Sequence, residues 1–219
     1  MVDTKLPLVQ VPIVDYGADE DAMVMYRERG TSRALELDNR GPIRFGPDGR
    51  LHSDIVDSYG RYGFYIFTDV IEEQELKEIE SDVADMLERS PVTKDAEIDK
   101  SGNTALGVGL TARNISWVRP LSDPLGGTDA SYGRHQAKMN EPAPPTEAPD
   151  YVVQLFLGSL QFSDACLRLY GHPDLLRVAE TINGPDFTPF NEAVWIKQPG
   201  LGGSVAWHQD GWTHWDSPE

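Results

Sequence analysis

In the first half of the chain, the spacing of apolar residues is typical first of a helix, then of a strand, and then of a helix again. Residues 53–63 fit a short helix with Ser53 or Asp54 as its cap, and the apolar run 63–67 is typical of a buried strand. From about residue 72 to 88, apolar residues recur at helical spacing and the opposite face is acidic. The pattern predicts a helix, a strand and a second helix in that order.

The second half predicts more helices and then strands. Helices are expected at about 152–170, closed by Gly171, and at about 173–182, which starts at a proline and ends before Asn183-Gly184. After residue 189, NEAVWIKQPG and SVAWHQD are strand-like and are separated by the glycine turn GLGG.

Two regions lack a clear period. Residues 1–52 are interrupted by Pro and Gly, so we expect an arm or capping segment ahead of a main domain at 53–219. Residues 101–150 contain 6 Gly and 6 Pro. Long loops of this kind often cover active sites, which favours a lid-like role for this region.

Composition narrows the class of protein. Of 219 residues, 39% are hydrophobic, enough for a core, and 19 basic against 36 acidic residues give a net charge of −17. That charge argues against nucleic acid or an anionic membrane as a partner. The single Cys166 excludes an internal disulfide and favours a buried structural thiol. No signal-peptide pattern or membrane-length apolar run is present, so we expect a cytoplasmic protein.

Four of the five histidines are followed by aspartate two positions later, in the pairs His52/Asp54, His172/Asp174, His208/Asp210 and His214/Asp216. On a strand such a pair projects from one face and can bind one metal ion. The first two pairs fall at predicted helix starts, where capping by the aspartate is the simpler interpretation. The third follows a strand-like segment, and a metal site is the hypothesis there. His214 is about 20 Å further along if that strand continues, so it is a poor third ligand.

Three segments in this order resemble the phytanoyl-CoA dioxygenase family: SYGRYGFYIF with the acidic helix after it, HPDLLRVAETINGPDF, and WIKQPGLGGSVAWHQDGWTHW. The resemblance covers roughly residues 53–216, and the loop region 101–150 is its least diagnostic part. Members of the family are non-haem iron enzymes that use 2-oxoglutarate. The resemblance implies an α+β chain with a double-stranded β-helix, that is, a jelly roll with outer helices, and an iron held by two histidines and a carboxylate.

Carried over by position, His208 and Asp210 would be catalytic ligands of Fe(II). The aspartate ligand favours hydroxylation over halogenation. Candidates for contacting the co-substrate 2-oxoglutarate are Lys197 and Gln209, with a solvent-facing lysine as the alternative. Candidates for the substrate site are Trp207 and Trp212, or else they are packing residues, and Arg113 and Arg119, or else they are exposed loop charges.

Relatives place a second histidine ligand and a 2-oxoglutarate-binding arginine on strands far downstream, whereas nine residues follow Asp210 here. A jelly roll also needs about eight strands. We therefore expect this chain to be the N-terminal portion of such a hydroxylase of a small molecule. The remaining strands would be missing or supplied by a complementing chain, and the unpaired edges favour a homo-oligomer.

Two other functions stay open. The chain can be a non-catalytic binding or interaction protein that keeps the helical layer and lacks the distal ligands. It can also be a metal-independent fragment in which His208 and Asp210 pair with each other.

Overall fold

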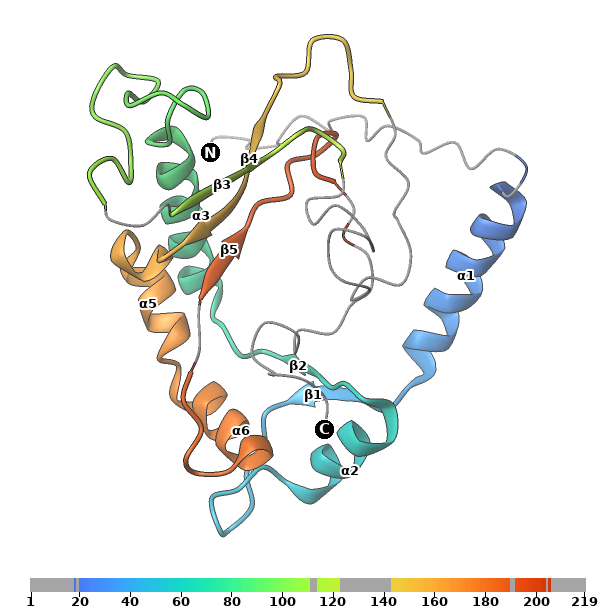
Figure 1. Ribbon diagram of the computed structural model, residues 1–219. Coiled ribbons are helices and arrows are strands. Elements are labelled where there is room, and N and C mark those ends of the chain that lie inside the picture. Colours follow the sequence, from blue (N-terminus) through green and yellow to red (C-terminus); the bar gives the residue numbers. More distant parts are fainter. Residues whose placement is uncertain are drawn as a thin grey trace, which may run out of the picture. The chain divides into compact units, whose positions relative to one another are not determined.

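The computed structural model describes residues 18, 20–110, 114–122, 143–189, 192–203 and 205 (Figure 1). Its helices are α1 (Glu20–Glu36), α2 (Ser53–Tyr62), α3 (Glu73–Glu88), α5 (Asp164–Tyr170) and α6 (Pro173–Asn183), with the 3-10 turn η2 (Ser159–Gln161). Its strands are β1 (Arg40–Pro42), β2 (Ile66–Thr68), β3 (Ile115–Val118), β4 (Val152–Leu157) and β5 (Ala193–Trp195).

Contacts within the chain define two compact units. The helical unit comprises Asp15–Asp85 and Ser159–Glu192, and the sheet unit comprises Met1–Val14, Met86–Gly158 and Ala193–Glu219. Of the segment 1–52, which we expected to be an arm or capping segment, residues 15–52 belong to the same unit as α2. Each unit is described by itself below.

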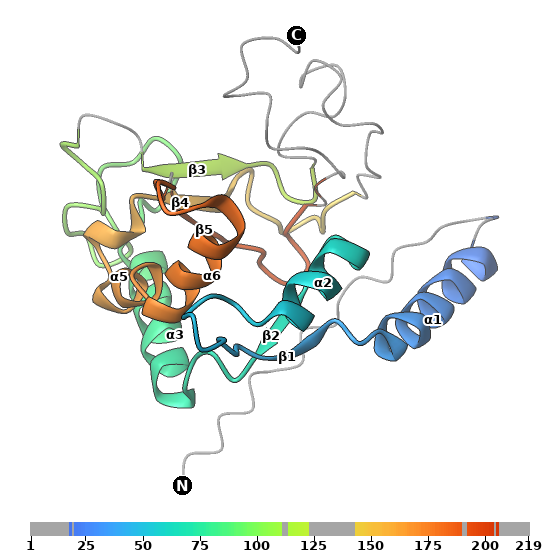
Figure 2. The same ribbon diagram turned by 90° about the horizontal axis from the view of Figure 1, so that it is seen from below.

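In the helical unit, β1 and β2 form a parallel pair, and the chain crosses from one to the other through α2. A parallel pair requires such a crossover because a tight turn cannot join strands that run the same way. Figure 2 shows α2 beside these two strands. The helix ends at Gly63, whose φ of 79° is the left-handed conformation that glycine adopts at least cost, and its N–H donates to the carbonyl of Tyr59.

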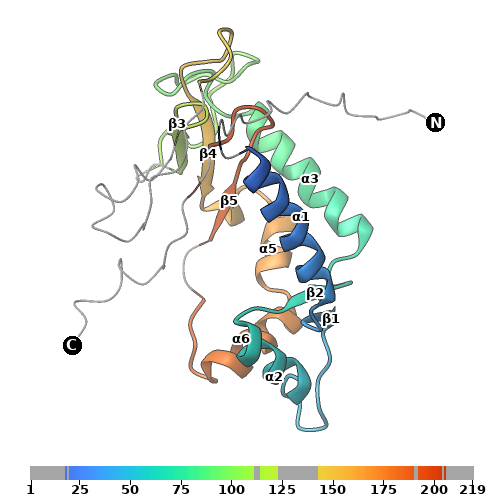
Figure 3. The same ribbon diagram turned by 90° about the vertical axis from the view of Figure 1, so that its right-hand side faces the viewer.

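A core cluster joins α2 to α6 in this unit. Its buried members are Leu51, Ile55 on α2 and Val178 on α6, and four further residues pack against it: Ile43, Phe45, Tyr65 and Phe67. Figure 3 shows α2 and α6 side by side. The apolar faces of two helices about 120 positions apart in sequence thus share one core.

Polar contacts fix α6 to the loop before α2. Thr181 on α6 accepts a hydrogen bond from the Leu51 backbone N–H at 3.1 Å, and Arg177 donates to the Gly49 carbonyl at 2.8 Å. The Arg177 guanidinium also lies 3.7 Å from the ring centroid of Phe45. These contacts hold the loop in one place ahead of His52.

The link between α3 and α5 uses a carboxylate. Asp82 on α3 accepts a hydrogen bond from the Ser163 hydroxyl at 2.7 Å, while the same hydroxyl accepts from the Cys166 N–H at 2.9 Å. Ser163 is therefore the N-cap of α5. Cys166 is buried, as its flanking sequence predicted.

The sheet unit contains an antiparallel sheet in the order β3-β4-β5. Phe156 on β4 is fully buried and pairs with Ile115 and Val194, so these three share one face. On the other face Leu155 pairs with Ser116 and Trp195. Trp195 is 50% exposed, so this second face is more open than the first.

One predicted helix is wrong in its first half. Residues 152–157 form the central strand β4, η2 is a short 3-10 turn, and only Asp164–Tyr170 is α-helical. An uninterrupted apolar run fits a buried strand as well as a buried helix, so its period alone could not decide. Pairing with β3 on one side and β5 on the other decides it, since both edges of β4 find hydrogen-bond partners.

Other expectations had mixed outcomes. The helices predicted at 72–88 and 173–182 are confirmed as α3 and α6. The strand expected at 63–67 is β2, which is short and shifted, and Ile66 is 44% exposed rather than buried. The 17-residue α1 was not predicted, since none of its residues is buried and it has no apolar stripe.

The described strands form one two-stranded and one three-stranded sheet and no closed barrel, so the jelly roll stays a prediction. Within the described residues, we find no helix with the length and apolar character needed to cross a bilayer.

Candidate functional site

Two of the predicted site residues lie in the described part of the chain. Lys197 follows β5 and Arg119 follows β3, and both belong to the sheet unit. Six others lie outside the described residues: His208, Asp210, Gln209, Trp207, Trp212 and Arg113. The structure therefore describes the segments that lead to the His208 motif.

Lys197 follows β5, whose pairing with β4 continues for one residue beyond Trp195. The Ile196 N–H donates to the Gln154 carbonyl at 2.7 Å, so strand pairing continues past Trp195. Exposure alternates along this stretch, with Trp195 and Lys197 exposed and Ile196 half-buried. The two side chains thus lie on one face, as predicted, and no acidic side chain in the described region pairs with the Lys197 ammonium.

A tight turn follows Lys197 and reverses the chain. The N–H groups of Leu201 and Gly202 both donate to the Gln198 carbonyl, at 3.1 and 2.8 Å. The turn folds back on the lysine so closely that a Cβ on Gly202 would lie 3.1 Å from the Lys197 Cα and Cγ atoms. The stem of the lysine is therefore held against the turn.

The reversed segment then meets the end of β3. The Leu121 N–H donates to the Leu201 carbonyl at 2.8 Å, and a Cβ on Gly203 would lie only 1.8 Å from the Ser122 carbonyl oxygen. Two backbones are in direct contact here. We call this contact between residues 121–122 and 201–203 the junction.

Arg119 lies at the start of the turn that forms one side of the junction. The Ser122 hydroxyl and N–H both reach the Arg119 carbonyl, at 2.8 and 3.2 Å. Leu121 between them has a φ of 58°, a left-handed conformation that costs a non-glycine residue of order 1–3 kcal/mol and concentrates at functional sites. The Arg119 side chain is exposed, and its guanidinium has no described ion-pair partner.

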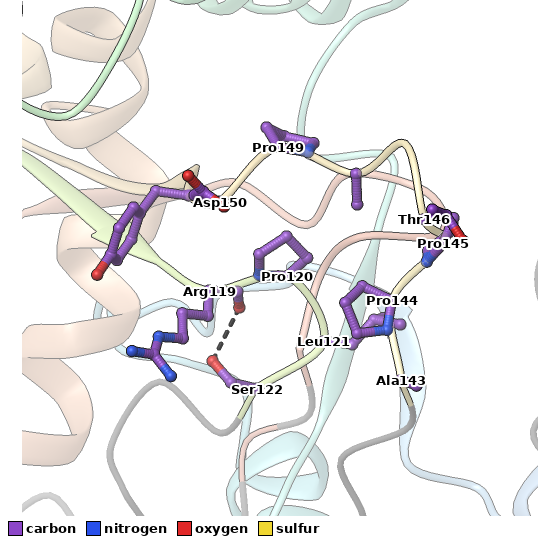
Figure 4. Close-up of a pocket in the computed structure, with 12 residues that line it drawn as sticks. Arg119, Pro120, Leu121, Ser122, Ala143, Pro144, Pro145, Thr146, Pro149 and Asp150 are labelled. Carbon is purple, nitrogen blue, oxygen red and sulfur yellow. Dashed lines mark hydrogen bonds between the residues drawn. The ribbon is translucent and has the colours of Figure 1, made fainter.

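The same turn forms a wall of an open pocket of about 740 Å³. Its lining comes from residues 119–122 and 143–151, with prolines on both sides (Figure 4). The Arg119 guanidinium extends away from Pro144 and Pro145 in this view. The volume is typical of a small-molecule site, and the lining contains a cation, Arg119, and a carboxylate, Asp150, beside proline rings.

The first two His-x-Asp pairs have ordinary structural roles. His52 Nδ1 lies 2.5 Å from Asp54 Oδ1, and Arg44 binds the other Asp54 oxygen. The hydrogen bond from Arg44, aided by the one from His52, lowers the pKa of Asp54 to about 2. His172 Nδ1 accepts from the Leu175 N–H at 3.5 Å. Both aspartates lie in a first helical turn, as predicted, but the N-cap is the histidine in each case, so aspartate as the cap residue is wrong.

Metal ligands do not cluster elsewhere in the described ranges. No group of three or more His, Cys, Asp or Glu side chains could hold a metal ion there.

No protein-family model, curated protein or solved structure matches this chain.

Sequence reasoning missed the junction. The run GLGG was interpreted only as a turn, although its last glycine makes the closest backbone approach at this site. A pair of glycines where one turn residue would be enough is a signal for such an approach. The partner segment, 121–122, carries no signal of its own in the sequence.

Proposed function

We propose that this chain carries the metal-binding motif and a substrate-pocket wall of an Fe(II)- and 2-oxoglutarate-dependent hydroxylase of a small molecule. His208 and Asp210 are the metal ligands. Bound iron and 2-oxoglutarate would supply oxidative decarboxylation coupled to hydroxylation of a C–H bond.

The observation that carries the proposal is the junction with a cation on each side of it. Lys197 contacts the turn at Gly202, and Arg119 begins the turn that ends at Ser122. In a chain of net charge −17, cations without an acidic partner are available to bind anionic ligands. A dicarboxylate co-substrate and an anionic substrate both require such groups.

The motif follows Lys197 closely in the sequence, since His208 is eleven positions further along. His208 follows Gly203 by five residues, and an extended segment of that length spans at most about 17 Å. One short segment therefore connects Lys197 to the motif, and the junction connects that segment to the turn that begins at Arg119. In this proposal Lys197 and Gln209 contact 2-oxoglutarate, Arg119 and Arg113 contact the substrate, and Trp207 and Trp212 line its site.

A second candidate is a metal-independent protein in which His208 and Asp210 pair only with each other. One observation favours it, because His52 and Asp54 form such a pair in this chain at 2.5 Å. The two candidates differ in their affinity for iron.

Anaerobic titration of the purified chain with Fe(II) and 2-oxoglutarate separates them. With the third ligand supplied by a neighbouring chain, we expect a visible charge-transfer band from the chelated complex, lost in His208→Ala and retained in the matched variants His52→Ala and His172→Ala. No band in the wild-type chain, or a band that His208→Ala leaves intact, would contradict the proposed metal site.

A further inference from the structure

We propose that the outer edge of β5 is a docking surface for a second copy of this chain, whose own β5 pairs with it in the antiparallel sense about a two-fold axis. The paired stretch is residues 193–197, and Trp195 lies opposite Trp195 of the second copy. This docking surface belongs to the sheet unit alone and does not depend on the proposed metal site.

The backbone groups of Trp195 point towards this outer edge. The Ile196 N–H donates to the Gln154 carbonyl, so these two residues form a hydrogen-bonded pair between β5 and β4. Hydrogen-bonded and non-bonded pairs alternate along an antiparallel ladder, so the adjacent pair of Trp195 with Leu155 is non-bonded. The N–H and carbonyl of Trp195, and by the same alternation those of Ala193, are therefore directed away from β4. Among the described residues, no hydrogen bond uses these groups.

The two edges of this sheet differ in how well they are protected against further pairing. The register of β3 with β4 shifts between Ser116 and Trp117, and an irregularity of this kind twists an edge strand and discourages another strand from joining it. The register of β5 with β4 has no such shift, and residues 193–197 contain no proline. An edge without these features is a template for another extended segment.

Charge and symmetry favour a second copy as the occupant of this edge. Residues 193–197 contain no acidic residue and one lysine, in a chain of net charge −17. Copies of such a chain repel each other over most of their surface, so they approach best where acidic residues are absent. Two-fold pairing also places the donors of each edge against the acceptors of the other, which satisfies both copies at once.

The register follows from which residues face the edge. A hydrogen-bonded pair requires two such residues, and pairing Trp195 with its own copy places Ala193 opposite Lys197 of the second copy. Trp195 is 50% exposed and lies on the same face as the exposed Lys197. The two Trp195 rings then lie side by side, and each has the lysine of the other copy as its diagonal neighbour, which allows aromatic and cation–π contacts. The two lysines lie at opposite ends of the paired stretch, about 14 Å apart.

The first test uses the unmodified chain and measures amide hydrogen exchange by NMR at a series of protein concentrations, with sedimentation velocity to give the dimer fraction. We expect the Trp195 amide to gain protection in step with the dimer fraction. The Val194 amide, which faces Phe156 on β4, should be protected at every concentration. A chain that stays monomeric would overturn the proposal. So would a Trp195 amide protected in the monomer, because another segment of the same chain then covers the edge.

The second test removes the edge donor by Trp195→Pro. Proline has no N–H, and β4 does not use this one, so the three-stranded sheet keeps its hydrogen bonds. The dimer Kd should rise at least about 100-fold, because each copy loses its central donor and its ring. Trp195→Ala keeps the donor and loses only the ring, so the Kd should rise about tenfold.

The matched control is Val118→Pro on the other edge of the sheet. Val118 pairs with Val152, and by the same alternation its N–H faces the outer edge of β3. Its dimer Kd should stay within about twofold of the unmodified chain, since proline is tolerated where the N–H points outwards. A dimer that Trp195→Pro leaves intact would overturn the proposal. If that variant fails to fold, Trp195→Ala and the concentration dependence of the Trp195 amide decide.

Discussion

The starts of α2 and α6 contain the same triplet, yet their histidines make different contacts. His52 and His172 are both N-caps with nearly the same backbone, at φ −56° and ψ 139° against φ −60° and ψ 120°. His52 binds Asp54 through its ring, whereas His172 caps the helix by accepting from the Leu175 N–H. The two histidines have the same backbone position at a helix start, but their rings bind different partners.

The neighbours explain the difference. The His52 N–H donates to the Arg44 carbonyl, which brings the Arg44 side chain to Asp54 and fixes that carboxylate beside the imidazole. At α6 the residue after the histidine is Pro173, and Asp174 lies 3.7 Å from Arg177 one turn later. With its aspartate directed to that arginine, the His172 ring is free to bond to the backbone.

The comparison bears on the proposed metal site. The His-x-Asp triplet has two different roles within the described residues: in one the histidine ring binds the aspartate, and in the other it binds a backbone N–H. The role of His208 and Asp210 therefore depends on what surrounds them, which is why the proposed function rests on the junction and its cations.

The largest effect should come from the core that both helices share. Ile55 is 1% exposed and belongs to the cluster with Val178, so Ile55→Ala should lower the free energy of unfolding by about 2–4 kcal/mol through the cavity it leaves. Urea denaturation measures this loss. The exposed Ile66→Ala is the control and should cost less than about 1 kcal/mol. If Ile55→Ala leaves the hydrogen exchange of the α6 amides unchanged, the two helices do not depend on one core.

A smaller effect should separate the two histidines. His172→Ala removes the acceptor for the Leu175 N–H and should lower the free energy of unfolding by about 1 kcal/mol, the usual cost of losing an N-cap. His172→Asn should restore most of it, because asparagine is a good N-cap. His52→Ala should change stability less, since His52 makes no side-chain capping bond. Equal losses of unfolding free energy for His172→Ala and His52→Ala, measured by urea denaturation, would contradict this difference between the two histidines.

The smallest effect is a pH dependence at Asp54. Its pKa is about 2 in the folded chain and 3.8 ordinarily, so the unfolded chain binds the proton more readily. The contribution of Asp54 to stability is therefore complete above pH about 3.8 and is lost as the pH falls through about 2. A carboxyl NMR titration should give a midpoint near 2 that rises towards 3.8 in Arg44→Gln. A midpoint that Arg44→Gln leaves in place would exclude Arg44 as the main cause.

The sequence by itself determined the elements whose signals are local. The helices α3 and α6 have an apolar stripe, and α6 also has a proline at its start and a glycine at its end, so a few neighbouring residues specify each. The first-turn aspartates of α2 and α6 were predictable for the same reason. Lys197 was placed on the face of Trp195 by strand alternation alone.

The tertiary structure decided what depends on partners far along the chain. Residues 152–157 became a strand because β3 and β5 hydrogen-bond to both of their edges, and the choice between Asp54 and a backbone N–H as the partner of each histidine depended on which arginine lay nearby. The junction joins residues 80 positions apart through backbone atoms. The glycines on one side of it are a local signal, but residues 121–122 carry none, so the sequence cannot say which segment the glycines approach.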